Sequence, residues 1–371
     1  MQSKHKLLVA AGGTGGHLYP AQALASELMQ NRQNLELLFA GAGLSTNRYF
    51  HKELYPFEDV SSGTPFRGNI FKAFWRIFSG IKRSMQLLET FKPDLVVGFG
   101  SYHSFPLLVA ALLKRIPIVL FESNAAPGKV NRLFSRWATV TAVHFAHASE
   151  KLSGKTLEVA MPLGAHKPSL ELDREKARKF FGLEPDRFTM LVFGGSQGAH
   201  SINKIFCQVA AQLSLNFPNF QVIHLTGHRK DTDEVRHAYG LLNIPVCVKE
   251  FEESMDYAWK ASDLAICRSG AATLAELLAH KVPSILIPYP FAADDHQRKN
   301  AQIMQSEVRG SRLLLESDLS AERLYGLLHE LISHDFWALK EMQKSISQYK
   351  VRGQKSELST IVGEILERAK M

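Results

Sequence analysis

Short apolar runs alternate with amphipathic segments along the first part of the chain. Apolar runs of this length predict strands that are buried on both faces, which is typical of a parallel sheet. Segments with apolar residues at helical spacing lie between them, as at residues 21–30 and 105–115. The predicted strands cover residues 6–11, 35–40, 94–98, 117–121 and 139–143.

The alternation stops at Met161-Pro162-Leu163-Gly164 and then restarts. Proline and glycine at this point predict a linker near residues 161–168. The second series of predicted strands covers residues 189–193, 221–225, 246–249, 264–267 and 284–287.

This alternation predicts two Rossmann-like α/β domains, each with a parallel sheet joined by right-handed crossovers. A chain of 371 residues has room for two domains of about 100–200 residues each. We place them at residues 1–162 and 163–350. Residues 351–371 carry apolar side chains at helical spacing from Leu358 to Leu366, so we expect a final helix that packs back across the domains.

Two glycine-rich loops each follow a predicted strand and precede a predicted helix. They read Gly12-Gly13-Thr14-Gly15-Gly16-His17 and Gly194-Gly195-Ser196-Gln197-Gly198-Ala199. Glycine lets the backbone approach a ligand closely, and the first N–H groups of a helix attract an anion. Because ligands of parallel sheets bind beyond the carboxyl ends of the strands, we predict two anion sites that face one cleft.

Neither loop fits the common nucleotide-binding motifs. Neither continues into Gly-Lys-Ser or Gly-Lys-Thr, so the lysine and hydroxyl of a nucleoside triphosphatase are missing. Leu18 stands where a dinucleotide-binding loop has its third glycine. The sequence therefore argues against a kinase, an ATPase or a dehydrogenase, and either loop alone is also compatible with a tight structural turn.

His17 lies at the predicted start of the first helix, where the helix dipole disfavours a charged imidazolium. A neutral imidazole at this place can accept a proton as a general base. It can equally cap the helix or donate to a phosphate, and its position leaves both interpretations open.

A third candidate anion site, Arg268 to Thr273, follows the predicted strand at residues 264–267. Arg268 can direct two donors to a phosphate. Glu276, on the same predicted helix, can accept both hydroxyls of a ribose. Amide and imidazole groups within residues 294–300 suit the hydroxyls of a sugar.

Two acidic segments lack the ligand set of a metal site. Asp294 and Asp295, followed by His296, have no matching further ligand. Asp231-Thr232-Asp233 is typical of an exposed helix start. We therefore expect no metal.

The composition is that of an ordinary globular protein, with 45% apolar and 22% charged residues. A net charge of +8 favours an acidic partner, which the charge alone does not identify as nucleic acid, anionic membrane or phosphorylated substrate. Cys207, Cys247 and Cys267 lack metal-ligand or redox spacing, as expected in a reducing compartment. No apolar run is long enough for a signal peptide or a membrane span, so we expect a protein that is neither secreted nor integral to a membrane.

Residues 70–83 predict a helix with two distinct stripes. Such a helix suits a membrane interface, because aromatic rings enter the headgroup boundary and cations attract anionic lipid. The pattern fits a core-facing helix with a solvated rim equally well. The apolar stripe holds Ile70, Phe71, Phe74, Phe78 and Ile81, the basic stripe holds Lys72, Arg76 and Arg83, and Trp75 lies between them.

Taken in order, the two glycine loops, Arg268-Ser269-Gly270-Ala271 to Glu276, and His296-Gln297 to Asn300-Ala301 resemble the MurG family. Its members are bacterial UDP-N-acetylglucosamine:lipid I transferases that make lipid II for peptidoglycan. The resemblance covers nearly the whole chain. It implies an α/β fold of the GT-B type, with the acceptor bound by the N-terminal half and the sugar nucleotide by the C-terminal half.

The resemblance also implies the reaction and its setting. GlcNAc moves from UDP-GlcNAc to the C4 hydroxyl of MurNAc in lipid I, with inversion in one displacement and without a cofactor or catalytic metal. The polyprenyl-linked acceptor implies peripheral association with the cytoplasmic face of the bacterial inner membrane and its anionic surface. This favours the membrane interpretation of residues 70–83. We expect cell-wall synthesis proteins as further partners. We do not expect the protein to bind nucleic acid.

In the second half, the resemblance implies a set of donor-binding residues. Ser196 and Gln197 would meet the diphosphate or the uridine, and Glu276 would bind the ribose. Gln297, with Asn300 behind it, would hold the GlcNAc hydroxyls. The residues around the nucleotide would be Phe251, near the uracil, with Arg268 and Thr273.

In the first half, the resemblance implies an acceptor site with His17 as the base that takes the proton of the attacking hydroxyl. Arg268 and the loop N–H groups would stabilise the departing UDP. The residues placed around the acceptor are Thr14, Gly15, Gly16, Tyr102, Glu122 and Asn124.

The chain departs from the family pattern in three segments. Ser101 and Phe105 stand where glycine is usual, and Gly164 replaces a linker arginine near the donor phosphates. Phe121-Glu122-Ser123-Asn124 replaces a typical His-Glu-Gln-Asn. Two alternatives therefore stay open: a GT-B transferase for another lipid acceptor, such as diacylglycerol, and a sugar-nucleotide-binding protein without turnover.

Overall fold

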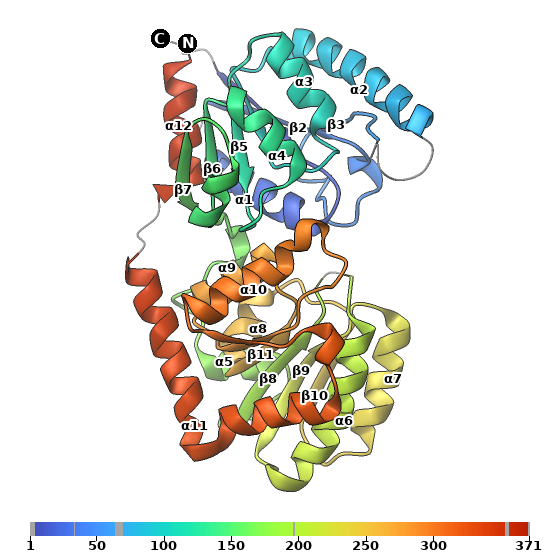
Figure 1. Ribbon diagram of the computed structural model, residues 1–371, viewed down its shortest axis with the longest axis vertical. Coiled ribbons are helices and arrows are strands. Elements are labelled where there is room, and N and C mark those ends of the chain that lie inside the picture. Colours follow the sequence, from blue (N-terminus) through green and yellow to red (C-terminus); the bar gives the residue numbers. More distant parts are fainter. Residues whose placement is uncertain (1–3, 33, 64–69, 196, 353–355, 370–371) are drawn as a thin grey trace. The chain divides into compact units, whose positions relative to one another are not determined.

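The computed structural model describes residues 4–32, 34–63, 70–195, 197–352 and 356–369. The chain forms two compact units. One consists of Met1–Gly164 and Lys355–Met371, and the other of Ala165–Gln354. Each unit has a parallel sheet of its own (Figure 1).

The described residues of the first unit form a sheet of eight strands, in the order β14-β7-β6-β5-β4-β1-β2-β3. All its strand pairs are parallel, and β4, β5 and β6 are buried along their whole length, because helices cover both faces. The strands are β1 (His5–Ala10), β2 (Leu35–Gly41), β3 (Phe57–Asp59), β4 (Leu95–Gly98), β5 (Ile118–Glu122), β6 (Val140–Val143), β7 (Thr156–Ala160) and β14 (Ser356–Glu357).

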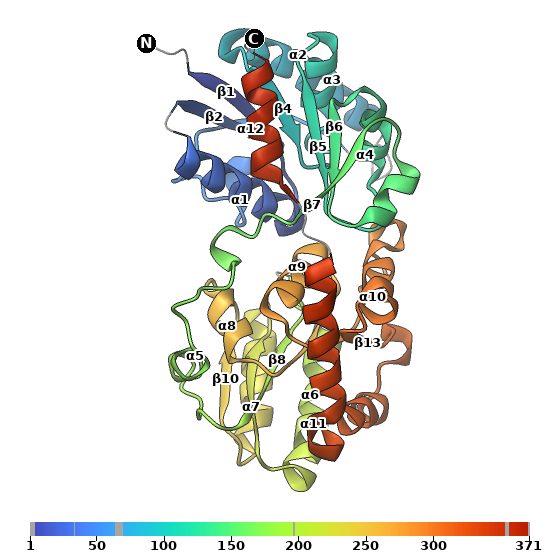
Figure 2. The ribbon, with the colours of Figure 1, turned by 90° about the vertical axis from the view of Figure 1, so that its left-hand side faces the viewer.

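The helices of the first unit lie on both faces of its sheet. Figure 2 shows α12 beside α1 on the near face, while α2 and α3 pack together on the opposite face. An ion pair of 3.1 Å between Arg32 and Glu367 links the end of α1 to α12. The C-terminal segment is therefore part of the first unit. The helices are α1 (Gly15–Asn31), α2 (Ile70–Phe91), α3 (Phe105–Leu113), α4 (Lys129–Phe134) and α12 (Leu358–Arg368).

The second unit is built on a sheet of six strands among its described residues, in the order β10-β9-β8-β11-β12-β13, again with parallel pairs. The strands are β8 (Phe188–Phe193), β9 (Phe220–Leu225), β10 (Val246–Lys249), β11 (Leu264–Cys267), β12 (Ser284–Leu286) and β13 (Ser311–Leu313).

Alternate residues of β8 point to opposite faces of this sheet. Met190 and Val192 enter a core that also contains apolar side chains of α6, α7 and α11. Phe193 instead contacts Trp259 of α8, with ring centroids 5.5 Å apart. The helices are α5 (Arg174–Phe180), α6 (His200–Asn216), α7 (Arg229–Gly240), α8 (Met255–Ala261), α9 (Ala271–His280), α10 (His296–Ser306) and α11 (Ala321–Arg352), whose helical geometry is interrupted between Ser333 and Phe336.

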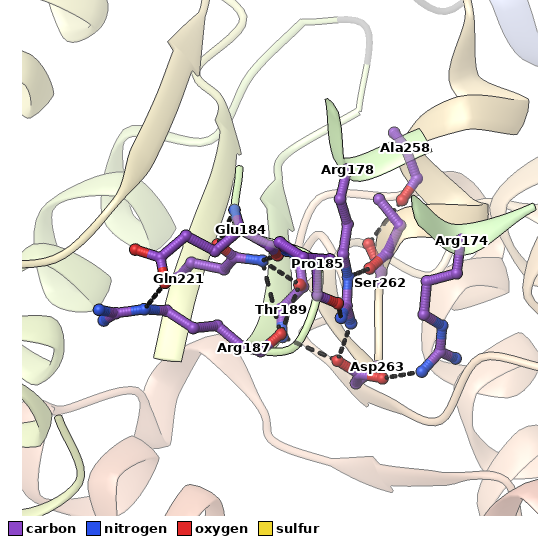
Figure 3. Close-up of polar contacts among 11 residues, drawn as sticks. Arg174, Arg178, Glu184, Pro185, Arg187, Thr189, Gln221, Ala258, Ser262 and Asp263 are labelled. Carbon is purple, nitrogen blue, oxygen red and sulfur yellow. Dashed lines mark hydrogen bonds and ion pairs between the residues drawn. The ribbon is translucent and has the colours of Figure 1, made fainter. Parts of the chain in front are cut away.

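An ionic network around the buried Arg178 fixes the amino edge of the second sheet (Figure 3). Arg178 is 3% exposed, and its guanidinium donates to Asp263 at 2.6 Å and to the Pro185 carbonyl. Asp263 also accepts from the backbone N–H of Thr189 at 2.8 Å and from Arg174 at 2.7 Å. Since ligands of such sheets bind at the opposite, carboxyl edge, we assign this network to folding.

The predicted fold class is confirmed, because both units are α/β with parallel sheets. Each strand predicted from the sequence is present, and no end differs by more than one residue. The sequence analysis missed β3, β7, β13 and β14. These strands are short or lie near a sheet edge, where the apolar pattern is weak.

Candidate active site

The candidate residues of the first unit lie on loops that leave adjacent strands. Ala10, at the end of β1, pairs with Gly98, at the end of β4, and Gly98 pairs with Leu120 of β5. The loops after β1, β4 and β5 therefore meet at the carboxyl edge of the sheet. Thr14 to His17 follow β1, and Tyr102 follows β4. Glu122 ends β5, and Asn124 follows it.

The first glycine loop turns directly into α1. Gly13 has φ +91°, a left-handed conformation, and its carbonyl accepts a bond of 2.6 Å from the Asn47 side chain. The Thr14 carbonyl accepts from the N–H of His17, at 3.1 Å, while the exposed Thr14 side chain does not cap the helix. Gly16 is exposed as well. The first turn of α1 thus has no side-chain cap that would compete with an anion.

The loop after β4 lies directly against the first glycine loop. A Cβ on Gly12 would fall 2.7 Å from Cβ of His103, and one on Gly13 would fall 3.1 Å from its Nδ1. Ser101 has φ +71°, and its Oγ lies 2.7 Å from His103 Nδ1. Tyr102 is half-buried, and its carbonyl accepts from the Ser62 hydroxyl at 2.5 Å.

Glu122 organises the loop that follows β5. Its carboxylate is 3% exposed and accepts from the backbone N–H groups of Asn124 and Gly128, both at 2.9 Å. The Asn131 side chain donates a further bond of 2.9 Å. Burial raises the pKa of Glu122, although these donors favour its charged form. The donors and the burial give Glu122 a supporting position beneath the loop that carries Asn124.

The predicted membrane residues lie on the exposed side of α2. Phe71, Phe74, Trp75 and Phe78 are between 61% and 77% exposed, and Trp75 meets Phe78 edge to face, with centroids 6.2 Å apart. The core-facing interpretation of the aromatic stripe is therefore wrong. Lys72, Arg76 and Arg83 are also exposed.

The small residues of α2 face the interior instead. Ala73, Gly80 and Ser84 are buried, and a Cβ on Gly80 would fall 1.9 Å from the Ser61 carbonyl. Arg83 pairs with Glu58 at 2.9 Å. Within the described part of the chain, no helix is long and apolar enough to cross a membrane.

In the second unit, the glycine loop after β8 packs against the loop after β9. A Cβ on Gly227 would fall 2.2 Å from the Gly198 Cα, so neither loop has room for a side chain at this contact. Gln197 is exposed, and Ala199 precedes α6 without a side-chain cap. The predicted donor residue Ser196 lies outside the described residues.

Arg268, directly after β11, is 8% exposed and already has an anionic partner. Its guanidinium donates to the Glu316 carboxylate at 2.5 Å and to the Pro288 carbonyl at 3.2 Å, and it lies over the Tyr289 ring. Ser201, at the start of α6, donates to the same carboxylate at 2.6 Å. Burial tends to raise the pKa of Glu316, but these bonds and the Arg268 charge lower it.

Glu276 on α9 receives a donor on each carboxylate oxygen. His166 Nδ1 lies 2.8 Å from one oxygen, and the Trp259 indole N–H donates to the other at 3.0 Å. Each oxygen keeps one lone pair for a hydroxyl donor. Burial tends to lower the pKa of His166, but its hydrogen bond and charge interaction with Glu276, with the charge of Asp256, raise it. His280 adds a bond of 3.0 Å to the His166 carbonyl.

The two predicted sugar-binding residues of α10 differ in accessibility. Gln297 is half-buried, and its side-chain oxygen accepts from the Tyr289 N–H at 3.0 Å. Asn300 is fully buried and donates to the Ser269 carbonyl at 3.1 Å. Asn300 therefore supports the Arg268 loop from behind Gln297.

The two remaining donor candidates border the same edge of the second sheet. Thr273 lies in the first turn of α9, where its Oγ1 would be 3.8 Å from a Cβ on Gly270. Phe251 follows β10 and is 50% exposed. The described donor residues Gln197, Phe251, Arg268 and Thr273 thus lie on loops or a helix start after β8, β10 and β11. Gln297 lies in the first turn of α10, and Glu276 and Asn300 lie farther along α9 and α10.

One prediction in this unit is wrong in part. Asp231 lies in the first turn of α7, as expected, but it is only 7% exposed. Its carboxylate accepts from Asn203 at 2.8 Å and lies 3.0 Å from His200 Nδ1. Asn203 in turn contacts His224, whose pKa burial lowers to about 3. Ligand atoms of His200, Asp231 and Glu234 lie within 4.8 Å of one another, which is close enough for a divalent cation.

Several residues that organise these loops were missed by the sequence analysis: His103, His166, Trp259 and Glu316. Each belongs to no motif and reaches its partner only through the fold. A weak signal was present for His103, because it directly follows Ser101 and Tyr102 in a loop that departs from glycine.

Comparisons with known proteins agree along the whole chain. Residues 7–143 match the family described as glycosyltransferase family 28 N-terminal domain, and residues 189–357 match its C-terminal domain. A UDP-N-acetylglucosamine–N-acetylmuramyl-(pentapeptide) pyrophosphoryl-undecaprenol N-acetylglucosamine transferase of Protochlamydia amoebophila is 41% identical, over 96% of this chain and 95% of its own. The protein of the same name from Chlamydia pneumoniae is 36% identical, over 87% of this chain and 88% of its own.

A solved structure gives the same result. The crystal structure of Acinetobacter baumannii MurG is 27% identical, covers 98% of this chain and 99% of its own, and superposes with a TM-score of 0.76.

Proposed function

The chain belongs to glycosyltransferase family 28, and from this membership we propose that it transfers GlcNAc from UDP-GlcNAc to the C4 hydroxyl of MurNAc in lipid I. The product is lipid II for peptidoglycan. The observation that carries the proposal is the 41% identity to a transferase of this name over 96% of the chain. The glycine loops at the carboxyl edges of both sheets support it, because a diphosphate-linked donor and a diphosphate-linked acceptor each need an anion site.

In this proposal the second unit holds the donor. The loop N–H groups before α6 meet the diphosphate, and Phe251 lies by the uracil. Glu276 accepts the ribose hydroxyls with the lone pairs that His166 and Trp259 leave. Gln297 binds the sugar, with Asn300 as its support.

Arg268 does not act as a freely available cation for a phosphate, because the Glu316 carboxylate already neutralises one side of its guanidinium. The remaining N–H groups can still reach an oxygen of the departing UDP, and the ion pair holds them in a fixed direction.

In the first unit, His17 is the proposed general base. It sits in the first turn of α1, and the helix dipole favours its neutral form, which can take the hydroxyl proton as the sugar carbon is attacked. Inversion in a single displacement needs no covalent intermediate and, in this proposal, no metal. Positioning of the two substrates then supplies most of the acceleration.

The lipid-linked acceptor requires access to a membrane surface. We assign this to α2, because its aromatic side chains are exposed although they are apolar. Lys72 and Arg76 add attraction to anionic lipid, on the cytoplasmic face of the inner membrane.

Transfer of labelled GlcNAc from UDP-GlcNAc to purified lipid I tests the proposal. We expect labelled lipid II. Transfer to diacylglycerol but not to lipid I would identify another acceptor, and binding of UDP-GlcNAc without any transfer would identify a protein without turnover. Either result overturns the proposed reaction.

A further inference from the structure

Ser101 and His103 form a polar pair beside the first glycine loop that the proposed mechanism does not use. Ser101 holds φ +71°, a left-handed conformation that L residues other than asparagine and aspartate seldom adopt. Since serine is strained at this φ, we considered which contacts its hydroxyl makes.

The Ser101 hydroxyl is hydrogen-bonded to one ring nitrogen of His103. Its Oγ accepts the backbone N–H of His103 at 3.3 Å and lies 2.7 Å from Nδ1 of the same residue. A hydroxyl that donates to Nδ1 leaves the ring proton of a neutral His103 on Nε2.

The ring is held flat against backbone that only glycine permits. Cβ and Cγ of His103 would lie 2.7 and 3.3 Å from a Cβ on Gly12, and Nδ1 and Cε1 would lie 3.1 and 3.3 Å from one on Gly13. Burial lowers the pKa of His103, which favours the neutral ring. The His103 ring therefore has a fixed place where the loops after β1 and β4 meet.

A fixed N–H donor beside the start of α1 suits an anionic oxygen, because the first N–H groups of the helix attract the same charge. In the proposed function, the anion that the first unit binds is the pyrophosphoryl group of the acceptor. We propose that His103 binds this group by donating from Nε2 to a phosphoryl oxygen, and that Ser101 acts as the positioning residue that fixes the His103 tautomer. The inference rests on the proposed function.

Steady-state kinetics with lipid I and UDP-GlcNAc test the binding role. His103→Leu should raise KM for lipid I about tenfold or more and leave KM for UDP-GlcNAc within about twofold, since a bond to a charged group is lost only on the acceptor side. His103→Gln offers an amide donor of similar reach and should recover most of the affinity. An unchanged KM for lipid I in His103→Leu would overturn the inference, as would equal rises for both substrates.

Ser101→Gly separates a structural role from the positioning role. Glycine tolerates φ +71°, so the variant should melt at the same temperature as the parent or higher. Its KM for lipid I should nevertheless rise, because His103 loses its tautomer partner. Ser101→Ala, which keeps the strain, should show the same rise in KM with lower stability. Parent-like KM in both variants would remove Ser101 from the proposal.

Histidine ¹⁵N spectra of the full chain give a readout that does not depend on turnover. In the parent, His103 should show the Nε2–H tautomer, and inorganic pyrophosphate should shift its Nε2 signal. The His103 signal is assigned as the one that is missing from the spectrum of His103→Gln. An Nδ1–H tautomer or an unshifted signal contradicts the proposal even if lipid II is made. A parent without transfer but with the shifted signal would refute the proposed function and leave the anion site standing.

Discussion

Glu276 is the one acidic residue among the predicted donor residues, and each oxygen of its carboxylate has a hydrogen-bond partner. Glu276→Ala should weaken UDP-GlcNAc binding by about 1–3 kcal/mol, because charge-assisted bonds to the ribose are lost. Calorimetry on the folded variant measures this change. Glu330→Ala is the matched control, since Glu330 is an exposed carboxylate of the same unit that pairs with Arg312 at 2.9 Å. An affinity equal to the parent's would remove Glu276 from the donor site.

The His166–Glu276 pair also predicts a pH dependence of stability. Because folding raises the pKa of His166 above its ordinary 6.5, the pair stabilises the fold fully below that value. The stabilisation is lost as pH rises through the higher folded pKa. Urea denaturation should therefore show a larger difference in unfolding free energy between the parent and His166→Gln at about pH 5.5 than at about pH 9.

The neighbouring His280 gives a control of opposite sign. Burial lowers its pKa, although Glu276, Asp256 and the His166 carbonyl favour its charged form. The effect of His280→Gln should thus grow as pH rises. If the His166→Gln difference stays constant with pH, the ion pair does not contribute to stability in this way.

His17 is predicted to act on the acceptor alone. His17→Ala should lower turnover by about 10²–10⁴-fold and leave KM for UDP-GlcNAc nearly unchanged, since a general base acts in the chemical step. His51→Ala, at an exposed histidine of the same unit, should behave like the parent. A loss confined to donor affinity would move His17 to the donor side.

For single residues, the sequence predicted which loops carry the candidate side chains. It did not predict the hydrogen-bond partners that fix those side chains in place. Motif spacing identifies Glu276, because an acidic residue on a helix after a strand suits a ribose. It does not identify His166, which is 110 residues away and meets Glu276 only in the folded unit. Asp231 was misread for the same reason, because its burial depends on the packing of Asn203 from α6.

Among the elements, α2 shows what periodicity can and cannot decide. An aromatic stripe at helical spacing fits a core or a membrane equally well. The decisive signal is the opposite stripe, because Ala73, Gly80 and Ser84 are small and recur at helical spacing. Small side chains let the helix approach α3 and the segment after β3 closely, so the aromatic face is left exposed.

Membrane binding by α2 is tested by removing its aromatic rings. Replacing Phe74, Trp75 and Phe78 with serine should reduce cosedimentation with anionic vesicles, because the rings supply insertion. The variant should remain folded, since each ring is at least 61% exposed. A matched control replaces exposed apolar residues of the second unit, Leu215 and Leu241, with serine. Binding by the aromatic variant at the parent's level would exclude α2 as the membrane surface.

The basic residues of α2 contribute a separate, salt-sensitive part. Replacing Lys72 and Arg76 with glutamine should weaken vesicle binding at low salt and have less effect as salt screens the charges. Arg83→Gln should matter less than Arg76→Gln, because Glu58 already pairs with Arg83. A larger effect for Arg83→Gln would contradict this order.

For the whole molecule, alternation of strands and helices was sufficient to predict two parallel-sheet units, because buried parallel strands must be continuously apolar. Three edge strands, β3, β13 and β14, escaped prediction. Of these, β14 is a short exposed pair, Ser356 and Glu357, that forms only when the chain end returns to β7. That return is a long-range event which local patterns do not encode.

Because the C-terminal helix α12 returns to the first unit, we can predict which residues unfold together when its packing is weakened. Leu366 of α12 is fully buried in the first unit, and Leu328 of α11 is fully buried in the second. Either leucine replaced by alanine should cost about 2–5 kcal/mol through lost burial and a cavity. Since each unit has its own core, the loss should be confined to the unit that carries the substitution.

Hydrogen exchange resolved by peptide measures where the loss falls. Leu366→Ala should speed exchange in α1 and β4, against which α12 packs, although these elements lie hundreds of residues earlier in the chain. Exchange in α6 and β8 should stay at the parent's rate. Leu328→Ala should do the reverse, because Leu328 shares a core with α6. Faster exchange throughout both units in either variant would show that they unfold as one, and the C-terminal helix would then stabilise the whole chain rather than the first unit alone.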